Sequence, residues 1–371
     1  MILVTTVGRG SMDQYASELA VRLPEIPVLA TDESRRVEGE FNRPLASLDL
    51  LRSLRSDAGF VRRLRRLGEA LHFPNHHLAR YGLFMRVPYI VTVHDLIRYF
   101  DLQRRRPFIH RPNLSDRIHL ALDYAGIRRA DAIIAVSNTT KADIVEHLGV
   151  PESRVHVVYE GVDRRRFHRT EARPFDFPYV LYVGSEHPRK NLGGLFEAFA
   201  LLKASGRYPD LRLVKVGAAG GTESDFRAVT ERLVQEHRLG DSFVIVDRVH
   251  DDALPAYYSG AACTVLPSLY EGFGFPAVEA MACGSPVIVS SAGSLPEIVA
   301  DAGIVVSPRV PEQLASAIRQ LLDSPERADA LRAAGSRRAA AFTWERAAIG
   351  TRRVYSIVES MALPRAAAVV A

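Results

Sequence analysis

The chain has 371 residues, of which 47% are apolar and 25% are charged, with a formal net charge of +5. This length and composition suit two globular domains and exclude a disordered chain. Its two cysteines, Cys263 and Cys283, exclude a disulfide framework and a cysteine-rich metal site, and we interpret both as core residues. The longest apolar runs are too short to span a membrane, and the Met-Ile-Leu-Val start is strand-like rather than a signal peptide. We therefore expect a cytoplasmic protein.

Strands and helices alternate along the first half of the chain. A strand from Met1 to Thr6 leads through the loop Val7 to Ser11 into a helix from Asp13 to Leu23. Further strands are expected at Pro88 to Val93, Ala132 to Val136, and Val155 to Val158. Nearly continuous apolar strands that alternate with helices predict a parallel sheet with helices on both faces.

The basic residues concentrate in this half: residues 1–170 hold 27 Lys and Arg against 20 Asp and Glu. The densest segment, Leu51 to Leu71, combines helical apolar spacing with Arg62, Arg63, Arg65 and Arg66. One interpretation is the solvated face of a core-packed helix. The other is attraction to anionic lipid headgroups or to a phosphate-bearing acceptor. Nucleic acid is not expected as a partner, because no recognised nucleic-acid module is present.

A second series of elements follows a linker around Asp163 to Phe177. Its expected strands are Tyr179 to Val183, Leu211 to Val216, Phe243 to Val246, Ala262 to Leu266, Val287 to Ser290 and Gly303 to Val306. Its closing helices are Glu312 to Leu322, Glu326 to Ala340, and Thr343 to Met361. We predict an α/β protein of two doubly wound, Rossmann-like domains that face each other across a cleft, with residues 1–168 in the first, 169–345 in the second and 346–371 as a final helix.

A Gly-rich loop and a short helix follow the strand that ends at Leu266. Gly272 to Gly274 form the loop, Pro276 suits the first helical turn, and Gly284 suits a left-handed helix end. A loop of this kind presents backbone N–H groups and the positive end of the helix dipole, which suits a diphosphate.

Glu271 precedes this loop, and Glu279 lies on the first turn of the expected helix. Two carboxylates would repel a phosphate, so hydroxyl-rich groups at both ends of a diphosphate are their natural partners. A nucleotide sugar has this composition. The alternative is a chance pair of solvated glutamates, which is common on amphipathic helices.

Two cations lie at the start of the helix that follows the strand Tyr179 to Val183. Arg189 and Lys190 are electrostatically misplaced there unless an anion lies beside them. We interpret them as clamps on a diphosphate, with an exposed basic pair as the alternative.

Histidines occur at several positions of the first half. His94 and Asp95 end a buried strand and are expected to point into the cleft, although a satisfied structural histidine is the ordinary alternative. His72, His76 and His77 are interpreted as loop residues rather than metal ligands, because the adjacent pair has poor geometry for one ion. No Asp-x-Asp occurs in the chain, so neither a divalent metal nor any other cofactor is expected.

The two glutamates, with seven residues between them, resemble the signature of the retaining family 4 glycosyltransferases of the GT-B fold. In that family the last helix crosses back to the first domain, so the resemblance implies the same return for residues 346–371. The resemblance implies that Glu279 accepts hydrogen bonds from the ribose and that Glu271 contacts the donor sugar. The segment PYIVTVHDL is similar to the family's corresponding strand and implies the same contact for His94. Residues 184–190 are similar to the family's Gly-x-x-x-Pro-Arg-Lys pattern, but Ser185 replaces an arginine that many members carry.

Further site residues follow from the same resemblance. The loop before Asp13 looks like the family's Gly-Gly loop, and the segment AVSNTTKADI resembles the family with Ser137 opening a helix. The catalytic assignments are His94, Arg189, Lys190 and Glu271. The donor-binding assignments are Gly10, Ser185, Gly272, Phe273, Gly274, Phe275, Glu279, Arg248 and Val249, and the acceptor-side assignments are Ser11 and Ser137.

The function implied is retaining transfer of a hexose from a nucleoside diphosphate sugar, as in polysaccharide biosynthesis. The acceptor is a hydroxyl of a glycan, a lipid-linked saccharide or a small molecule, and peripheral contact with an anionic membrane through Arg62 to Arg66 is one interpretation of the basic half. The PRKNL segment resembles members that use GDP-mannose, which favours a mannose-type donor over UDP-sugars. The alternatives are a nucleotide-sugar epimerase or a phosphorylase on the same fold, or a non-catalytic nucleotide-sugar-binding protein.

Overall fold

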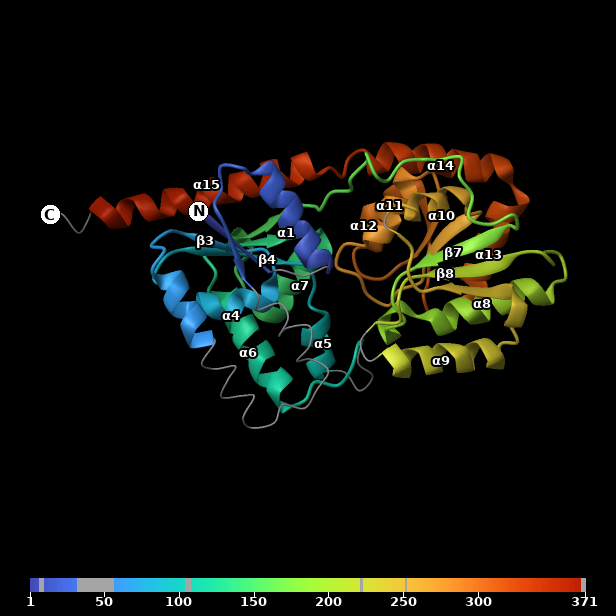
Figure 1. The fold of residues 1–371 in the computed structure, drawn as a ribbon, viewed down its shortest axis with the longest axis horizontal. Coiled ribbons are helices and arrows are strands. Elements are labelled where there is room, and N and C mark those ends of the chain that lie inside the picture. The colour runs from blue at the N-terminus through green and yellow to red at the C-terminus, as the bar shows by residue number, and fades with distance from the viewer. Residues whose placement is uncertain (7–9, 32–56, 104–107, 221–222, 251, 368–371) are drawn as a thin grey trace. The chain divides into compact units, whose positions relative to one another are not determined.

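The computed structural model describes residues 1–6, 10–31, 57–103, 108–220, 223–250 and 252–367 (Figure 1). The chain divides into two compact units. Unit 1 consists of residues 1–106, 110–161 and 344–371, and unit 2 of residues 107–109 and 162–343. Each unit contains one six-stranded parallel sheet, so the expected pair of doubly wound α/β sheets is confirmed.

The sheet of unit 1 has the strand order β2-β1-β3-β4-β5-β6. Its strands are β1 (Ile2–Thr6), β2 (Val28–Thr31), β3 (Leu71–Phe73), β4 (Tyr89–Val93), β5 (Ala132–Ala135) and β6 (Val155–Val157). Its helices are α1 (Ser11–Arg22), residues 57–65, η1 (His76–Leu78), α4 (Ala79–Gly82), α5 (Ile97–Gln103), α6 (Leu114–Arg129), α7 (Asn138–Leu148), η2 (Glu152–Arg154) and α15 (Trp344–Ala367).

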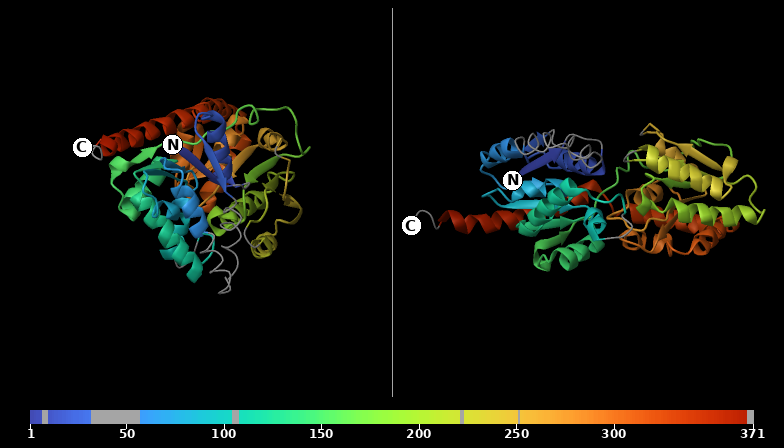
Figure 2. Two further views of the ribbon diagram at one scale, coloured as in Figure 1. Left: turned by 60° about the vertical axis from the view of Figure 1, so that its left-hand side comes forward. Right: turned by 90° about the horizontal axis from the view of Figure 1, so that it is seen from below.

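Helices cover both faces of this sheet (Figures 1 and 2). Alternate strand residues such as Val4 and Val91 join a core with the 57–65 helix, α4, α6 and α7. On the other face, α1 packs against α15, where the rings of Tyr15 and Trp344 lie 6.0 Å apart. The last helix of the chain is therefore part of the unit that contains the first strand.

The sheet of unit 2 has the strand order β12-β11-β10-β7-β8-β9. Its strands are β7 (Tyr179–Val183), β8 (Arg212–Val216), β9 (Phe243–Val246), β10 (Cys263–Leu266), β11 (Val287–Ser290) and β12 (Gly303–Val306). Its helices are η3 (Pro188–Lys190), α8 (Leu192–Ala204), α9 (Glu223–Glu236), η4 (Gly240–Ser242), α10 (Leu254–Gly260), α11 (Phe275–Ala282), α12 (Leu295–Val299), η5 (Ala300–Ala302), α13 (Pro311–Asp323) and α14 (Pro325–Ala339).

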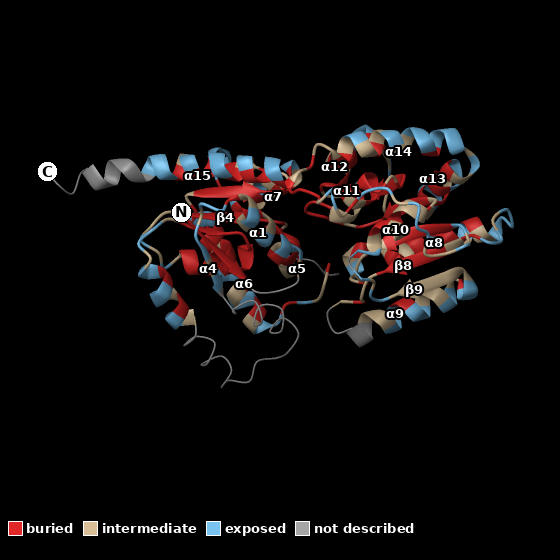
Figure 3. Cartoon of the chain, turned by 45° about the horizontal axis from the view of Figure 1, so that its top comes forward, coloured by how far each residue is buried: buried red, intermediate tan, exposed pale blue. Residues whose placement is uncertain are grey.

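The core of unit 2 lies between its sheet and α8 and α13. Figure 3 shows red, buried strands and a pale blue outer surface on α14. Cys263 belongs to this core, and both cysteines are buried and free, which confirms their interpretation as core residues. Among the described helices, none is both long and apolar enough to cross a membrane.

Two sequence-based expectations are wrong, and part of a third falls outside the described residues. β2 and β3 were not expected, and Leu71 begins β3 instead of ending a helix. His72 is a buried strand residue rather than a loop residue. In the segment expected as a helix from Leu51, residues 51–56 are not described, and helix is present at residues 57–65.

Candidate active site

The strand order of unit 2 places two loops side by side at the carboxyl edge of its sheet. β7 pairs with β10, and the order of the strands reverses at this pair. The crevice beyond such a reversal is where doubly wound sheets bind ligands. The loop after β7 contains Arg189 and Lys190, and the loop after β10 contains Glu271.

Glu271 accepts hydrogen bonds from both cations. Its Oε2 lies 2.8 Å from a terminal nitrogen of Arg189, and its Oε1 lies 2.6 Å from Lys190 Nζ. The Ser268 hydroxyl donates to Oε1 at 2.7 Å. Arg189 and Lys190, which the sequence assigned to a diphosphate, and Glu271, which it assigned to the donor sugar, therefore meet, although more than 80 positions separate the cations from the carboxylate.

The electrostatics keep Glu271 ionised. Its exposed fraction is 7%. Burial alone raises its pKa, but Arg189 and Lys190 outweigh burial and bring the pKa down to about 2. A carboxylate offers about four acceptor positions, and the three hydrogen bonds use three of them. One acceptor position on Oε2 is left for a ligand hydroxyl.

The backbone around Glu271 is fixed by the loop after β11. Ser294 Oγ donates to the Glu271 carbonyl at 3.1 Å and to the Phe273 carbonyl at 2.9 Å. Gly293 has a φ of 61°, and a Cβ there would lie 2.5 Å from the Glu271 carbonyl oxygen. Only glycine fits this close approach without displacing the Glu271 backbone.

Arg189 and Lys190 belong to the short 3₁₀ turn η3, and α8 begins only at Leu192. The expected position of the cations at a helix start is therefore corrected by one turn. Between them and α8, Asn191 adopts a left-handed conformation with φ of 57°. Its side-chain amide donates to the carbonyls of Pro267 and Pro308 at 3.0 and 2.8 Å, which ties the turn to the loop after β10.

Glu279 is the fifth residue of α11, just beyond the first turn on which it was expected. The buried Tyr258 hydroxyl donates to Glu279 Oε2 at 2.7 Å. Tyr258 of α10 thus orients the half-buried Glu279 carboxylate. The expected Pro276 in the first turn and the left-handed Gly284, with φ of 73°, are confirmed.

The other proposed donor residues of unit 2 differ in what they present. Phe273 is buried and packs against Phe275 and Phe342, so its ring anchors the loop. Gly274 has a φ of 97°, and a Cβ there would lie 2.6 Å from Leu295. Gly272 is also buried. The Ser185 hydroxyl forms a hydrogen bond with the His187 ring at 3.2 Å. Arg248 and Val249 lie in the loop after β9, where Arg248 is exposed.

Both ring nitrogens of His94 have hydrogen-bond partners within unit 1. Its Nδ1 lies 2.8 Å from Glu160 Oε1, and its Nε2 lies 2.8 Å from the Pro74 carbonyl oxygen. The Pro74 carbonyl can only accept, so Nε2 donates to it, while Nδ1 shares a hydrogen bond with the Glu160 carboxyl group. Burial alone lowers the pKa of His94, but the hydrogen bond to Glu160 outweighs burial and raises the pKa. Contact between a sugar and a ring nitrogen requires exchange of one of these bonds.

The remaining unit 1 candidates lie at helix starts. Gly10 N–H donates to Asp13 Oδ2 at 3.1 Å, and the exposed Ser11 begins α1. Ser137 is fully buried and caps α7, where its hydroxyl accepts from Thr140 N–H at 3.0 Å and donates to the Thr140 hydroxyl. It positions α7 rather than presenting a hydroxyl to an acceptor.

Four hydrogen-bond partners of the candidate site residues were missed from the sequence: Ser268, Tyr258, Ser294 and Glu160. Ser268 and Glu160 each follow a strand, which is the one signal that could have indicated them. Among the described residues, no group of three or more His, Cys, Asp or Glu is arranged to hold a metal ion. His76 and His77 are buried in η1 rather than in an open loop.

Comparison with known families agrees with this geometry. The profile "Glycosyltransferase Family 4" matches residues 11–166, and "Glycosyl transferases group 1" matches residues 163–338. The O-antigen chain mannosyltransferase B of Escherichia coli is 30% identical over 298 residues, which cover 77% of this chain and 74% of that protein. The chain belongs to glycosyltransferase family 4. It is a hexosyltransferase by family, which favours glycosyl transfer over the epimerase, phosphorylase and non-catalytic alternatives.

Two further relatives match this family 4 glycosyltransferase over shorter lengths. The MMP α-(1→4)-mannosyltransferase of Mycolicibacterium hassiacum is 34% identical over 62% of this chain and 54% of its own length. The D-inositol 3-phosphate glycosyltransferase of Geodermatophilus obscurus is 35% identical over 59% of this chain and 51% of its own length. The chain thus aligns with about half the length of these two relatives.

Solved structures agree on the fold. A sucrose-phosphate synthase from Thermosynechococcus elongatus superposes with a TM-score of 0.76 at 24% identity, over 97% of this chain and all of that one. Anabaena HepE in complex with UDP and glucose gives a TM-score of 0.74 at 17% identity, over 96% of this chain and 99% of that one. The family 4 glycosyltransferase described here therefore has the GT-B fold.

Proposed function

We propose that this enzyme transfers a hexosyl group, with mannosyl favoured, from a nucleoside diphosphate sugar to an acceptor hydroxyl, with retention at the anomeric carbon. The observation that carries the proposal is the Glu271 carboxylate held between Arg189 and Lys190 at the strand reversal of unit 2. Two cations and one carboxylate leave one net positive charge for a diphosphate.

The proposed roles follow from the contacts. Arg189 and Lys190 bind the diphosphate and stabilise the negative charge that grows on it as the bond to the anomeric carbon breaks. Glu271 keeps the two cations in place, and its remaining Oε2 position accepts a donor-sugar hydroxyl. Glu279, oriented by Tyr258, accepts from the ribose hydroxyls.

The proposed transfer reaction requires no nucleophile from the protein. The acceptor oxygen forms the new bond to the anomeric carbon on the face that the diphosphate leaves, and the acceptor proton passes to the departing phosphate oxygen. Because the cations stabilise this leaving group, the step is proposed to need no divalent metal.

The donor is identified by a thermal-shift screen against UDP, GDP, ADP and TDP, since a ligand that binds only the folded state raises its melting temperature. The names of two relatives contain mannosyltransferase, which supports GDP-mannose as the first donor to assay. Stabilisation by GDP and transfer from GDP-mannose support the proposal. Absence of any nucleotide-dependent shift, together with no release of nucleoside diphosphate from either GDP-mannose or UDP-glucose, contradicts it.

We further propose that unit 1 contacts an anionic membrane through Arg62, Arg63, Arg65 and Arg66, whose side chains are all exposed while Leu64 between them is buried. Each arginine near an anionic surface contributes about 1 kcal/mol, and less as salt rises. Replacing all four by glutamine should therefore reduce sedimentation with phosphatidylglycerol vesicles at low salt. Wild-type protein that ignores such vesicles contradicts this contact and favours a soluble acceptor.

A further inference from the structure

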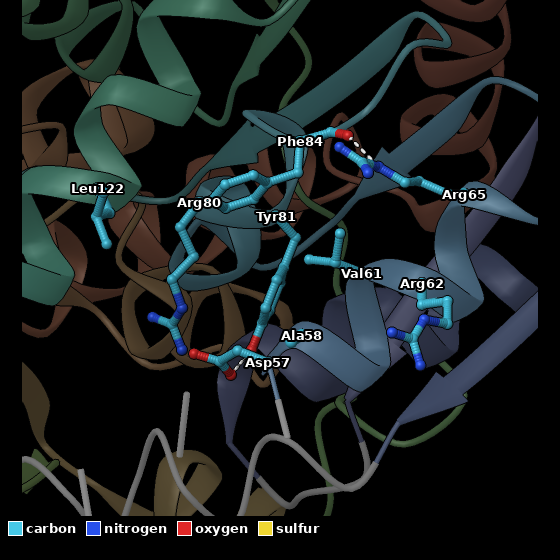
Figure 4. A pocket seen from close by; sticks show the side chains of 9 residues that line it. All are labelled: Asp57, Ala58, Val61, Arg62, Arg65, Arg80, Tyr81, Phe84 and Leu122. Atoms are coloured by element: carbon cyan, nitrogen blue, oxygen red, sulfur yellow. Dashed lines mark hydrogen bonds between the residues drawn. The ribbon is translucent and has the colours of Figure 1, made fainter. Parts of the chain in front are cut away.

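A pocket of about 400 Å³ opens in unit 1 between the 57–65 helix, α4 and α6 (Figure 4). Its walls are largely apolar and include Val61 from the first of these helices, the Tyr81 ring and Phe84 from α4 and the turn after it, and Leu122 from α6. None of the residues assigned above to the donor or to the chemistry lines it. A volume of this size holds a small headgroup and the first part of an attached chain.

The charged residues of the pocket are three arginines against one aspartate. Arg62 and Arg65 reach it from the 57–65 helix, Arg80 reaches it from α4, and Asp57 accepts a hydrogen bond from the Tyr81 hydroxyl at 2.8 Å. Arg65 Nε donates to the Phe84 carbonyl at 2.8 Å, which holds its guanidinium at the rim. An excess of guanidinium groups in a partly apolar pocket favours a phosphate or another compact anion.

Arg80 shows that this positive charge is built into the fold. Its side chain is nine-tenths buried and is held by Asp123 at 3.3 Å, which is a long distance for a charged pair. Its Nε is buried and has no hydrogen-bond partner among the described residues. The Asp123 carboxylate and the Tyr81 ring, whose centroid lies 5.2 Å from the guanidinium carbon, hold Arg80 at the pocket wall, so Arg80 adds fixed positive charge to the pocket.

An exposed apolar row continues from the pocket along α6. Leu114, Ile118 and Leu122 lie four residues apart on one helix face and are 75%, 49% and 38% exposed. Phe84, on the opposite wall, is 47% exposed. Free anions need no such row, and a purely apolar ligand needs no arginines. The combination fits an amphiphile.

We propose that this pocket binds the phosphate of a lipid, with the phosphate at Arg62 and Arg65 of the 57–65 helix and the apolar chain along Leu122, Ile118 and Leu114. The inference rests on the proposed glycosyl transfer in one respect: it identifies a phosphate-bearing lipid as the class of acceptor, or of acceptor carrier, that this enzyme recognises. The site would select individual lipid molecules, beyond the general attraction of exposed arginines to an anionic surface.

The test is calorimetric binding of n-dodecyl phosphate, below its micelle concentration, to the full chain. Inorganic phosphate and n-dodecyl maltoside serve as probes for the phosphate alone and the chain alone. We expect dodecyl phosphate to bind at least about tenfold more tightly than either. Equal affinity for inorganic phosphate overturns the role of the apolar row, and equal affinity for the maltoside overturns the role of the arginines.

Matched variants separate the pocket from general surface charge. The double variant Arg62→Gln/Arg65→Gln removes two pocket arginines, whereas Arg63→Gln/Arg66→Gln removes two exposed arginines of the same segment that do not line it. We expect about tenfold weaker dodecyl phosphate binding in the first and less than about twofold in the second. Equal losses overturn the proposal.

A second pair of variants tests the apolar row. Leu122→Gln should weaken dodecyl phosphate binding severalfold, while Ile349→Gln, a similarly exposed position on α15, should leave it unchanged. All six substituted side chains are exposed, so the variants should fold. The nucleotide thermal shift depends on unit 2 and is measured in parallel. If the shift is absent while dodecyl phosphate still binds, the proposed function fails and the lipid site stands; the reverse result overturns the lipid site alone.

Discussion

At the scale of single residues, Glu271 organises the candidate site. It meets Arg189, Lys190 and Ser268 through three hydrogen bonds, and its pKa of about 2 keeps it charged at any physiological pH. The sequence predicted both cations as ligands of the diphosphate and Glu271 as a contact of the donor sugar. It did not predict that they pair with one another, because the pairing joins loops from two strands far apart in the chain and depends on the strand order.

The ribose assignment of Glu279 leads to a prediction at this scale. Glu279→Ala should weaken nucleotide binding by about tenfold to a hundredfold and slow turnover at saturating donor much less, because a ribose contact is nearly the same in ground and transition states. Calorimetry with the preferred nucleotide measures the first effect. Tyr258→Phe, which keeps the carboxylate and removes only its hydroxyl donor, is the control and should weaken binding no more than severalfold. Unchanged affinity in Glu279→Ala would refute the ribose contact.

At the scale of elements, the site is built from loops that follow β7, β10 and β11. The sequence predicted these strands because each is a short, almost continuous apolar run, and it predicted the helix after Gly274 from its glycine and proline signals. β3 was missed for a physical reason. It has three residues with a histidine in the middle, and the partners that satisfy this histidine, Thr92 and Tyr355, come from β4 and α15. No local pattern reveals such partners.

Gly293 supports a prediction at the element scale. Gly293→Ala places a Cβ only 2.5 Å from the Glu271 carbonyl oxygen and also imposes the left-handed strain of about 1–2 kcal/mol, so it should lower both stability and turnover. Gly284→Ala is the matched control. It has a similar positive φ, but its new Cβ would meet only the flexible Arg169 side chain at 3.3 Å, so it should lower stability alone.

Thermal melts and steady-state transfer rates compare the two glycine variants. Equal turnover in Gly293→Ala and Gly284→Ala would contradict the view that the loop after β11 positions Glu271.

At the scale of the whole molecule, a buried polar network connects the end of the chain to the first unit. His72 on β3 bonds to the Tyr355 hydroxyl of α15 at 2.7 Å and to the Thr92 hydroxyl of β4 at 2.8 Å, and Thr92 bonds to Tyr15 of α1 at 3.2 Å. Hydrogen bonds between residues from both ends of the sequence thus hold the elements of unit 1 together. Composition and motif spacing predicted two sheets, but they do not reveal which residues hold α15 in place.

This network predicts how stability depends on pH. Burial lowers the pKa of His72 from 6.5 to about 3. Below about pH 6.5 the His72 side chain therefore binds a proton in the unfolded chain but stays neutral in the folded chain. Its contribution to the free energy of unfolding is full above pH 6.5 and falls as the pH drops toward 3. His94, whose pKa is raised, has the opposite sign and contributes most below pH 6.5.

Urea unfolding of the wild type and of His72→Gln between pH 5 and pH 8 tests the sign for His72. The wild type should lose more stability than the variant when the pH falls from 7 to 5, whatever the absolute stability of each. Parallel pH profiles would contradict a neutral, buried His72.

The central claim is that Arg189 and Lys190, held by Glu271, bind the diphosphate of the donor. It is tested most directly by calorimetric binding of the preferred nucleoside diphosphate and of the corresponding nucleoside to the wild type and to Lys190→Ala, all in excess EDTA. The account predicts that the wild type prefers the diphosphate by at least about tenfold without metal, that Lys190→Ala loses most of this preference while its affinity for the nucleoside is unchanged, and that its turnover falls by about a hundredfold. A preference that appears only when magnesium or manganese is added, or that survives in Lys190→Ala with normal turnover, would contradict it.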